Sequence, residues 1–403
     1  MKQASFWESE RLTMERSLEL TIESLRTYGP LYRHWAIAFS GGKDSTTVVT
    51  LVAHLLATGR IAAPESLTVL YADTRMELPP LQAAAMAILE AVHARGIQTQ
   101  VVLPALDDRY FTYMFGRGVP PPKNRGFRWC TPQIKVEPME LALKCLRDHY
   151  GEKFLMFTGV RIGESAARDQ RIALACSKDG AECGQGWLQV ETPEAVADVL
   201  APCLHWRVCH VWDWLTFHAP SAGFSTQVIA EVYGGDEKEE INARTGCIGC
   251  NLASKDVALD TLLELPQWRY LAPLKRLKPL YQELTKPQYR LRKDGTDRRK
   301  DGSLASNPMR LGPLTMEARR YGLAQVLDIQ AQVNREAKAQ GRLRIDLINE
   351  EEHARILALI EANTWPERWT GNEVRGDVLM PLVITDGVVQ HLLLDGMSGE
   401  VSA

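Results

Sequence analysis

Apolar runs and amphipathic stretches alternate along residues 35–160 of the chain. Four runs have the length and composition of buried strands: WAIAF at 35–39, SLTVLYAD at 66–73, IQTQVVLP at 97–104 and KFLMFTGV at 153–160. Between them, apolar residues recur at helical spacing over 44–58, 79–96 and 138–151. Strands and helices in this alternation predict an α/β fold, with a parallel sheet wrapped by helices.

The flanking segments are predicted to be helices and loops. An amphipathic helix at 8–28 ends at Gly29-Pro30, the polar stretch 161–186 is predicted to be a loop, and helical spacing dominates after residue 313. Asn349 and Glu352 have the spacing of a helix N-cap and its reciprocal partner. The chain therefore divides into an N-terminal helix (1–30), an α/β domain (31–260), a basic linker (261–312) and a mainly helical C-terminal region (313–403).

Composition narrows the class of protein without identifying it. The chain has 403 residues, 45% of them hydrophobic and 24% charged, as in an ordinary soluble globular protein. A net charge of −3 gives no overall nucleic-acid signature, so such binding would need a local basic patch. No apolar run approaches the length of a membrane span, and the first residues lack a signal-peptide core, so we expect a cytoplasmic protein.

The segment SGGKDS, which follows the first predicted strand, is typical of a phosphate-binding turn. Glycines let the backbone turn tightly, and the first turn of the next helix offers unpaired N–H groups and a positive dipole end. Lys43 would neutralise phosphate charge, and Asp44 is expected to help hold a metal ion that bridges phosphates. The spacing is too short for a Walker A loop. The expected binding residues are Ser40, Gly41, Gly42, Lys43, Asp44 and Ser45.

Among the eight cysteines, the pair Cys247 and Cys250 is the most informative. A two-residue spacer lets both sulfur atoms turn toward one ion, and Gly246 and Gly249 permit the tight loop. Four thiolates hold either structural zinc or a [4Fe–4S] cluster, and a pair with scattered single cysteines favours the cluster. The predicted ligands are Cys130, Cys183, Cys247 and Cys250, with Cys176 as a rival for the second. We expect buried, apolar surroundings for Cys145, Cys203 and Cys209.

The stretch KPQYRLRKDGTDRRKDGS, at 286–303, is predicted to be an exposed basic loop. Contacts from such a loop to nucleic-acid phosphates would be strongly salt dependent and largely independent of base sequence. A solvated loop without a ligand is the alternative interpretation. The candidate DNA-binding residues are Arg290, Arg292, Lys293, Arg298, Arg299 and Lys300.

Several motifs, taken in order, resemble one family. SGGKDS after a buried strand resembles the pyrophosphate loop of the ATP-pyrophosphatase (PP-loop) superfamily, and in particular of its phosphoadenosine-phosphosulfate (PAPS) reductase-like branch. Further segments that resemble this branch, in its order, are LYADTRMELP at 70–79, TGVRIGESAAR at 158–168, PCLHWRVCHVWDWL at 202–215 and ARTGCIGCNLA at 243–253.

The resemblance implies a Rossmann-like sheet of the adenine nucleotide alpha hydrolase type, binding ATP with Mg²⁺, with nucleotide and iron–sulfur sites both in residues 31–260. The adenine would lie at the end of the second strand, near Tyr71, Asp73 and Thr74. The phosphates would be contacted from the far side by Gly159, Arg161 and Arg168. Two arginines seven apart suit a polyanion, although a surface salt-bridge pair is the simpler interpretation of the arginines alone. The implied catalytic residues are Lys43, Asp44, Arg161 and Arg168.

Within that branch, the chain most resembles the DNA phosphorothioation proteins DndC and SspD. They combine the SGGKDS loop with an Arg/Lys-Trp-Cys-Thr segment, a Gly-Cys-x-x-Cys turn, a basic loop and a helical tail, and this chain has FRWCT, GCIGC and RLRKDGTDRRKDGS in that order. The resemblance implies an ATP pyrophosphatase and sulfurtransferase that acts on DNA in bacterial defence. Its partners would be a cysteine desulfurase as sulfur donor and other phosphorothioation subunits.

Three other functions stay open at the level of sequence. A tRNA thiolase shares the loop, the use of ATP and a cysteine-ligated cluster. A PAPS-type sulfonucleotide reductase carries its nucleophile in a C-terminal Glu-Cys-Gly motif, whereas Glu-Cys-Gly lies mid-chain here and Cys250 is the last cysteine. A nucleotide-sensing subunit that binds without turnover is the non-enzymatic alternative.

Overall fold

The computed structural model describes residues 12–123, 126–163, 187–189, 195–234, 246–299, 301–383 and 389–390. The chain forms two compact units that interleave along the sequence. Unit 1 comprises Met1–Pro104, Pro132–Cys247 and Asp256–Arg269, and unit 2 comprises Ala105–Thr131, Ile248–Lys255 and Tyr270–Ala403. The four-segment division drawn from the sequence stays a prediction.

Within the described residues, unit 1 is built on a six-stranded sheet with the order β3-β2-β1-β4-β6-β5. Neighbouring strands are parallel except β5 and β6, which are antiparallel. The predicted α/β fold is therefore confirmed, with one antiparallel edge strand that was not predicted. The strands are β1 His34–Phe39, β2 Ser66–Ala72, β3 Gln98–Val102, β4 Phe154–Phe157, β5 Trp187–Gln189 and β6 Ala197–Ala201.

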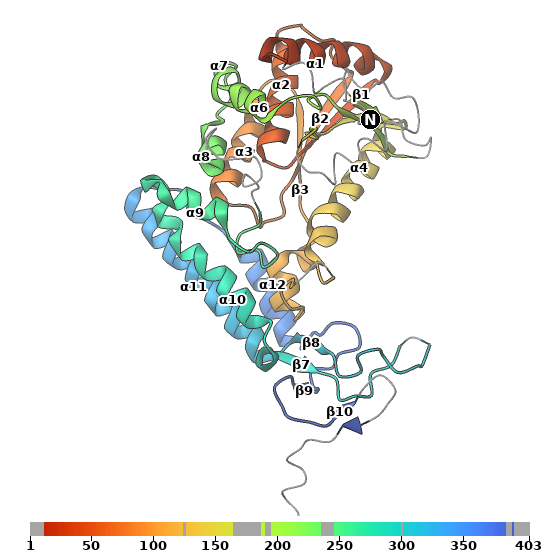
Figure 1. Cartoon of the computed structure of the whole chain (residues 1–403), viewed down its shortest axis with the longest axis vertical. Helices are drawn as coiled ribbons and strands as arrows, with labels where there is room; N and C mark the ends of the chain where they lie inside the picture. Colours follow the sequence, from red (N-terminus) through yellow and green to blue (C-terminus); the bar gives the residue numbers. More distant parts are fainter. Residues whose placement is uncertain are drawn as a thin grey trace, which may run out of the picture. The chain divides into compact units, whose positions relative to one another are not determined.

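Helices cover both faces of this sheet (Figure 1). The chain passes from β1 through α2 to β2 and through α3 to β3, then returns through α4 to β4 on the other side of β1. Because right-handed crossovers in opposite directions put their helices on opposite faces, α2 and α3 cover one face and α4 the other. The helices of unit 1 are α1 Met14–Tyr28, α2 Lys43–Ala57, α3 Pro79–His93, α4 Glu137–Tyr150, α6 Val208–Asp213, α7 Ala219–Ser221, α8 Gln227–Tyr233 and α9 Val257–Glu264.

Apolar packing of α4 holds the strands in register. The half-buried Leu143 and Leu146 of α4 pack against two clusters of buried residues, which come from the sheet and from α4 itself. The cluster members are Leu70, Val102 and Ala142 in one, and Ala36, Phe154 and Ala197 in the other.

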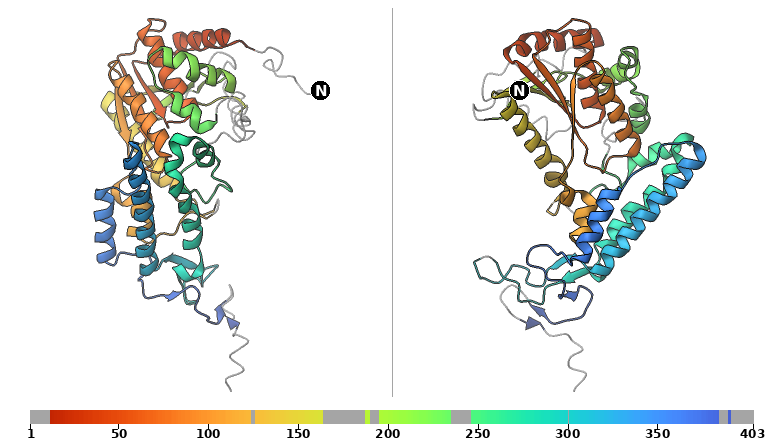
Figure 2. Two further views of the ribbon diagram at one scale, coloured as in Figure 1. Left: turned by 90° about the vertical axis from the view of Figure 1, so that its left-hand side faces the viewer. Right: turned by 180° about the vertical axis from the view of Figure 1, so that it is seen from behind.

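Unit 2 combines helices with small sheets. Helices α10 and α11 run alongside each other (Figures 1 and 2), and a three-stranded sheet has the order β8-β7-β9. The fully buried Arg319 of α11 donates to the carbonyl oxygens of Phe115, Gly116 and Thr364, which joins three segments of the unit. The regular elements include η2 Leu106–Asp108, η3 Thr112–Gly116, α10 Leu277–Leu284, η8 Pro287–Tyr289, β7 Arg290–Arg292, β8 Leu311–Leu314, α11 Met316–Gln340, α12 Glu350–Glu361, β9 Val374–Arg375, β10 Leu382–Val383 and β11 Val389–Gln390.

Most predicted elements are confirmed, and three expectations need correction. The capping box forms, because the amide of Glu352 donates to Asn349 Oδ1 at 2.8 Å and that of Asn349 to Glu352 Oε2 at 3.0 Å. The first described helix begins at Met14, because Thr13 caps it, and positions 8–11 of the predicted helix lie outside the described residues. Two of the cysteines expected to be buried, Cys145 and Cys209, are exposed.

The third correction concerns 286–303, which is not simply an exposed loop. It contains η8 and β7, and β7 pairs with β8 and β9. Segments distant in sequence supply those partner strands, so local composition could not indicate the pairing. Among the described helices, none is both long enough and apolar enough to cross a membrane.

Candidate functional site

The turn between β1 and α2 leaves the start of the helix without a side-chain cap. Gly41 has a φ of 72°, a left-handed conformation that glycine adopts readily. Gly42 is the N-cap residue and has no side chain to cap α2, which begins at Lys43. Helix amino ends attract anions through their amides and positive dipole end, and phosphate binding at SGGKDS stays a prediction.

The two serines of the turn bond to each other and to the backbone. Ser45 Oγ accepts from the amide of Ser40 at 3.2 Å and lies 3.1 Å from Ser40 Oγ. It also donates to the carbonyl oxygen of Gly42 at 3.1 Å. Both serines are predicted to bind phosphate, whereas in this structure their hydroxyls shape the turn. Direct phosphate contact by the serines stays a prediction.

Asp44 is held between two cations. Its Oδ2 is 2.7 Å from Lys43 Nζ and its Oδ1 is 2.6 Å from Arg161 Nε. The Arg161 side chain is only 2% exposed, and its Nη1 also donates to the carbonyl oxygen of Trp206 at 3.2 Å. Arg161 therefore anchors Asp44 at the amino end of α2, across 117 residues of sequence. Its implied contact with phosphate stays a prediction.

The charge state of Asp44 follows from this pairing. Burial raises the pKa of the carboxyl group, but the positive charges of Arg161 and Lys43 and their hydrogen bonds outweigh it and hold the pKa below its ordinary value. Asp44 is thus ionised at neutral pH. A carboxylate has about four lone-pair positions, so the two ion pairs leave capacity for a cation such as Mg²⁺. Metal binding by Asp44 stays a prediction.

The loop after β4 lies directly against the start of α2. A Cβ on Gly159 would be 2.9 Å from both the carbonyl carbon of Asp44 and the amide nitrogen of Ser45, so only glycine allows this approach. Because β1 and β4 are neighbours whose connections leave in opposite directions, their carboxyl ends form the switch point of the sheet. Ligands of open α/β sheets bind at such a point. The fold thus puts Gly159 beside the predicted phosphate turn.

The end of β2 carries the residues implied for adenine, and all three are buried. Tyr71 is fully buried beneath the turn, with its ring 3.6 Å from where a Cβ of Gly41 would be, and burial raises the pKa of its phenol. Asp73 accepts hydrogen bonds from Arg75 and Gln82 at 2.8 and 2.9 Å. Thr74 donates to Glu77 at 2.7 Å. These bonds shape the turn after β2, and adenine contact stays a prediction.

Sequence reasoning missed one residue of this site. Tyr233, the last residue of α8, accepts a hydrogen bond from the amide of Lys43 at 3.4 Å, and Lys43 Nζ lies 5.5 Å from the centre of its ring. The hydroxyl is also 3.2 Å from where a Cβ of Gly42 would be. Nothing near Tyr233 in the sequence marks it, because 190 residues separate it from the turn.

Comparison with protein families agrees with this geometry. Residues 34–220 match the phosphoadenosine phosphosulfate reductase domain. The matched span begins at β1 and contains the turn, Asp44, Gly159 and Arg161. Residues 34–220, most of which belong to unit 1, are thus similar to a PAPS reductase domain. Cys247, Cys250 and the basic stretch at 286–303 lie beyond the PAPS reductase match.

Individual similar proteins are distant. An uncharacterized protein of Methanocaldococcus jannaschii, MJ0066, is 25% identical over 189 residues, which cover 47% of this chain and 32% of that relative. The chain thus spans about a third of the length of the curated relative it matches.

Three solved structures align weakly. The PAPS reductase of Candida auris, a phosphate complex, has a TM-score of 0.32 and 13% identity over 52% of this chain and 89% of its own. The FMN adenylyltransferase of Candida glabrata, with FMN and the ATP analogue AMPCPP, has a TM-score of 0.30 and 14% identity over 52% and 62%. The U34-tRNA thiolase NcsA of Methanococcus maripaludis, with its [4Fe–4S] cluster, has a TM-score of 0.32 and 14% identity over 69% and 82%. At such scores the sheet topology of the chain itself, rather than these alignments, establishes the fold.

Two of the cysteines predicted to hold a cluster interact with each other, and the cluster itself stays a prediction. Cys130 and Cys250 both belong to unit 2, where burial and then the neighbouring Cys250 thiol raise the pKa of Cys130. Gly249 has a φ of 67° and packs so closely on Leu277 that a Cβ would be 2.8 Å from the leucine Cβ, which explains one glycine of the Gly-Cys-x-x-Cys turn.

A complete metal site is absent from the part of the chain that the structure describes. No group of three or more His, Cys, Asp or Glu side chains is placed there to hold a metal ion. Three of the four predicted ligands, Cys130, Cys247 and Cys250, are described, whereas a [4Fe–4S] cluster or four-coordinate zinc takes four. The fourth, Cys183, and its rival Cys176 lie outside the described residues, as do Arg168 and Lys300. The buried position of Cys203 agrees with expectation.

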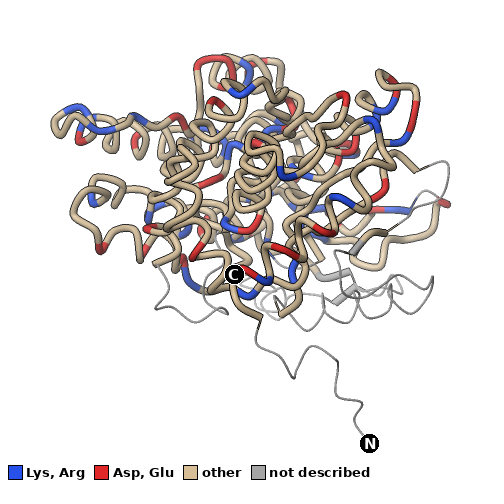
Figure 3. Tube along the Cα trace, turned by 90° about the horizontal axis from the view of Figure 1, so that it is seen from above, with Lys and Arg blue, Asp and Glu red and all other residues tan. Residues whose placement is uncertain are grey.

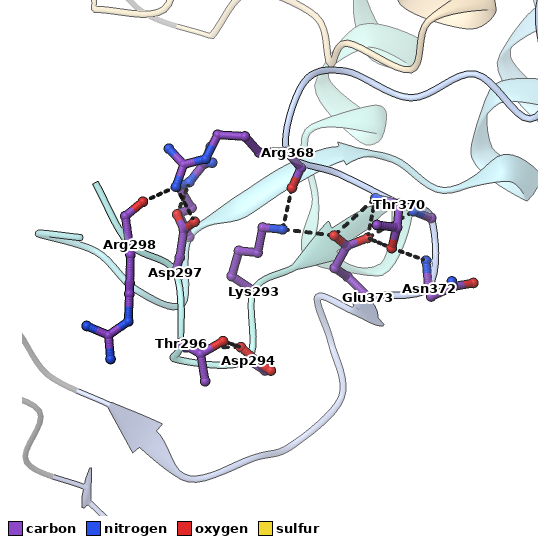
Figure 4. A network of polar contacts seen from close by, with 11 residues as sticks. Lys293, Asp294, Thr296, Asp297, Arg298, Arg368, Thr370, Asn372 and Glu373 are labelled. Carbon is purple, nitrogen blue, oxygen red and sulfur yellow. Dashed lines mark hydrogen bonds and ion pairs between the residues drawn. The ribbon is translucent and has the colours of Figure 1, made fainter. Parts of the chain in front are cut away.

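Many basic side chains of 286–303 are engaged within unit 2 (Figure 4). Lys293 Nζ is 2.9 Å from Glu373, donates to the Arg368 carbonyl at 2.6 Å and lies 4.3 Å from the centre of the Trp369 ring. Arg290 donates to the carbonyl oxygen of Gly312, and burial lowers its pKa to about 10.

The exposed candidates in this stretch are Arg298 and Arg299. Nearby, the buried Asp297 accepts from Arg310 at 2.7 Å and from Arg368 at 3.0 Å, so it neutralises arginines from two other segments. Acidic and basic residues are interspersed along the whole described chain (Figure 3), in keeping with the net charge of −3. DNA binding by this stretch stays a prediction.

Proposed function

We propose that this chain uses ATP to activate a phosphate of the DNA backbone so that sulfur replaces one of its oxygens. The observation that carries the ATP part is the uncapped amino end of α2, where Lys43 and the Arg161-anchored Asp44 meet at the switch point of a PAPS reductase-like sheet. The DNA part is supported by the motif order shared with phosphorothioation proteins and by the exposed arginines at 298–299.

The residues of the turn have distinct roles in this proposal. The amides at the start of α2 bind the β- and γ-phosphates of ATP, and Lys43 neutralises the charge that develops on the departing pyrophosphate. Mg²⁺ bound with the nucleotide would find Asp44 as its ligand and would supply further neutralisation of phosphate charge. Arg161, which is nearly inaccessible, positions Asp44 rather than touching the reacting atoms.

The chemistry requires two displacements. A non-bridging oxygen of the DNA phosphodiester attacks the α-phosphorus of ATP, and pyrophosphate leaves with the electron pair of the broken bond. The terminal sulfur of a cysteine persulfide, loaded by a cysteine desulfurase, then attacks the DNA phosphorus, and AMP leaves with the oxygen. A second thiolate attacks the carrier sulfur of the remaining S–S bond, which releases the thiophosphate and leaves a disulfide. No step is assigned to a metal cluster, because the described residues do not form one.

The identity of the sulfur acceptor is tested by offering the chain several candidate acceptors. The full chain is incubated with ATP, Mg²⁺, a desulfurase with cysteine, a thiol, and either duplex DNA, tRNA or PAPS. The proposal expects thiophosphate linkages in nuclease digests of DNA, detected by mass spectrometry, and their loss with Lys43→Ala. Thionucleosides from tRNA would instead identify a tRNA thiolase, and sulfite from PAPS a sulfonucleotide reductase.

A sensing subunit makes a different prediction in the same experiment. It would bind ATP and form no sulfur-containing product from any acceptor, even when extract proteins that supply missing subunits are added. The Lys43→Ala variant is matched by Lys275→Ala, a change of the same residue type in unit 2, outside the PAPS reductase match. Equal loss in both variants would contradict a specific role for Lys43.

A further inference from the structure

The carboxyl end of α8 contacts the phosphate turn through Tyr233, a residue with no role in the proposed function so far. The helix ends there, because Gly234 follows with a φ of 80°. The phenol ring packs edge-on against Trp212, with ring centres 5.6 Å apart, and Tyr233 is only 8% exposed. The ring is therefore supported from behind, and its hydroxyl is presented to the turn rather than to bulk solvent.

The Tyr233 hydroxyl lies beside the first amide of α2. The amide of Lys43 donates to it at 3.4 Å, which is long for a hydrogen bond and therefore weak. That amide belongs to the uncapped first turn of α2, the part of the helix that attracts an anion. A phenol both accepts with its lone pairs and donates its own proton, so a tyrosine that accepts from an amide in one state donates to a phosphate oxygen in another.

We propose that Tyr233 binds the terminal phosphates of the nucleotide through its hydroxyl, and holds Lys43 in position with its ring. The inference rests on the proposed use of ATP at this turn. On binding, a phosphate oxygen takes over the Lys43 amide, and the Tyr233 O–H donates to the same phosphate group. The ring keeps Lys43 Nζ, 5.5 Å from its centre in this structure, on the side of the turn where the phosphates bind.

Two substitutions distinguish the contribution of the Tyr233 hydroxyl from that of its ring. Tyr233→Phe removes the hydroxyl and keeps the ring, whereas Tyr233→Ala removes both. A hydrogen bond to a charged group is worth enough that its loss should weaken ATP binding by about tenfold or more. Tyr233→Ala should weaken it further. AMP, which has no β- or γ-phosphate, should bind with nearly unchanged affinity, and a merely structural role for Tyr233 would not produce this selectivity.

The experiment is isothermal titration of the full chain with ATP, inorganic pyrophosphate and AMP in the presence of Mg²⁺. Wild type, Tyr233→Phe, Tyr233→Ala and the control Tyr150→Phe are compared. Tyr150 is a matched control, because it is a tyrosine of unit 1 that lies on α4, where its hydroxyl is 3.1 Å from Thr68 Oγ1. Thermal unfolding of each variant establishes that it is folded.

The outcomes distinguish this inference from the proposal on which it rests. Weaker binding of ATP and pyrophosphate to Tyr233→Phe, with AMP and the control unchanged, is the expected result. If the wild type binds ATP and Tyr233→Phe binds it with equal affinity, the role of Tyr233 is overturned and the proposed function is left intact. Failure of the wild type to bind ATP or pyrophosphate would overturn both. Equal weakening of ATP and AMP would show a structural role and would also overturn the inference.

Discussion

The phosphate turn of unit 1 and the basic stretch of unit 2 both looked like anion sites in the sequence, but they use their charges differently. At the turn, one carboxylate and two cations converge on a helix end that lacks a side-chain cap. In the stretch 286–303, Lys293 is paired with Glu373, and Asp297 is occupied by arginines from elsewhere in the unit. The first arrangement positions charge at the amino end of a helix, whereas the second largely cancels charge inside the fold.

This difference shows that the surroundings of a charged side chain decide whether its charge can act on a ligand. A run of Lys and Arg overstates the positive surface when distant acids pair with it, and Glu373 lies 80 residues from Lys293. A single lysine at the start of a helix raises the local positive potential more, because the backbone dipoles of the helix add to its field. Variants that remove one charge at a time in each region test whether the two regions really differ in this way.

The largest expected effect comes from Asp44→Asn. The substitution leaves Arg161, which is 2% exposed, without its ionised partner. Removing one member of a buried ion pair typically costs about 3–5 kcal/mol of stability. Urea unfolding measures the loss. Asp294→Asn in the basic stretch is the matched control, because its side chain is exposed and an asparagine oxygen still accepts from Thr296. The control should lose about 0.5 kcal/mol or less, and equal losses would remove the distinction between the regions.

Within the basic stretch, Lys293→Ala and Arg299→Ala should have opposite consequences. Lys293 bonds to Glu373 and the Arg368 carbonyl, so its removal should cost about 1.5–3 kcal/mol of stability and leave DNA affinity nearly unchanged. Arg299 is exposed, so its removal should leave stability unchanged and reduce the salt dependence of DNA binding by about one phosphate contact. Filter binding over a range of salt concentrations checks this. If Lys293→Ala lost DNA affinity and Arg299→Ala did not, then Lys293 rather than Arg299 would be the DNA contact.

Gly159→Ala tests the close approach of the β4 loop to the turn. The added methyl group would be 2.9 Å from backbone atoms of Asp44 and Ser45, which cannot move away as a flexible side chain can. Overpacking of this kind costs about 1–3 kcal/mol, and it should weaken ATP binding by displacing the start of α2. Gly246→Ala is the control, because nothing lies within 4 Å of its added methyl group. If Gly159→Ala were as stable as Gly246→Ala, the loop would not be held against the helix.

The smallest expected effect is on the pH dependence of stability. The pKa of Asp44 is lower in the folded state than in the unfolded state. The ionised side chain therefore makes its full contribution to the free energy of unfolding above the unfolded pKa, about 4, and this contribution is lost as the pH falls through the folded pKa. The stability difference between wild type and Asp44→Asn should therefore narrow below about pH 4. Urea titrations between neutral and acidic pH measure it. A difference that stayed constant on acidification would mean that Asp44 has no depressed pKa.

Much of the fold was predictable because its signals are local. WAIAF, SLTVLYAD and IQTQVVLP each lie within a few residues of the observed β1, β2 and β3, and SGGKDS marked the turn between β1 and α2. The antiparallel β5 and the pairing of β7 with β8 and β9 depend on partners distant in sequence, so no local pattern announced them.

The site was predictable only as a set of residue types. Sequence and resemblance both pointed to Asp44 and Arg161, but only the fold revealed that they pair with each other, and that Arg161 is buried. Tyr233 was missed because a tyrosine at the end of a short helix is common, and its contact with Lys43 depends on how α8 packs. Burial of Cys145 was predicted wrongly, because an apolar-looking helix position turned out to face solvent.

The most direct test of the account is the identity of the phosphate released from ATP. The full chain is incubated with ATP, Mg²⁺, duplex DNA and a persulfide donor, and both pyrophosphate and orthophosphate are measured for the wild type and Lys43→Ala. The account predicts pyrophosphate together with AMP, and a loss of about a hundredfold or more in the variant. Orthophosphate with ADP, or pyrophosphate release that is indifferent to Lys43, would contradict it.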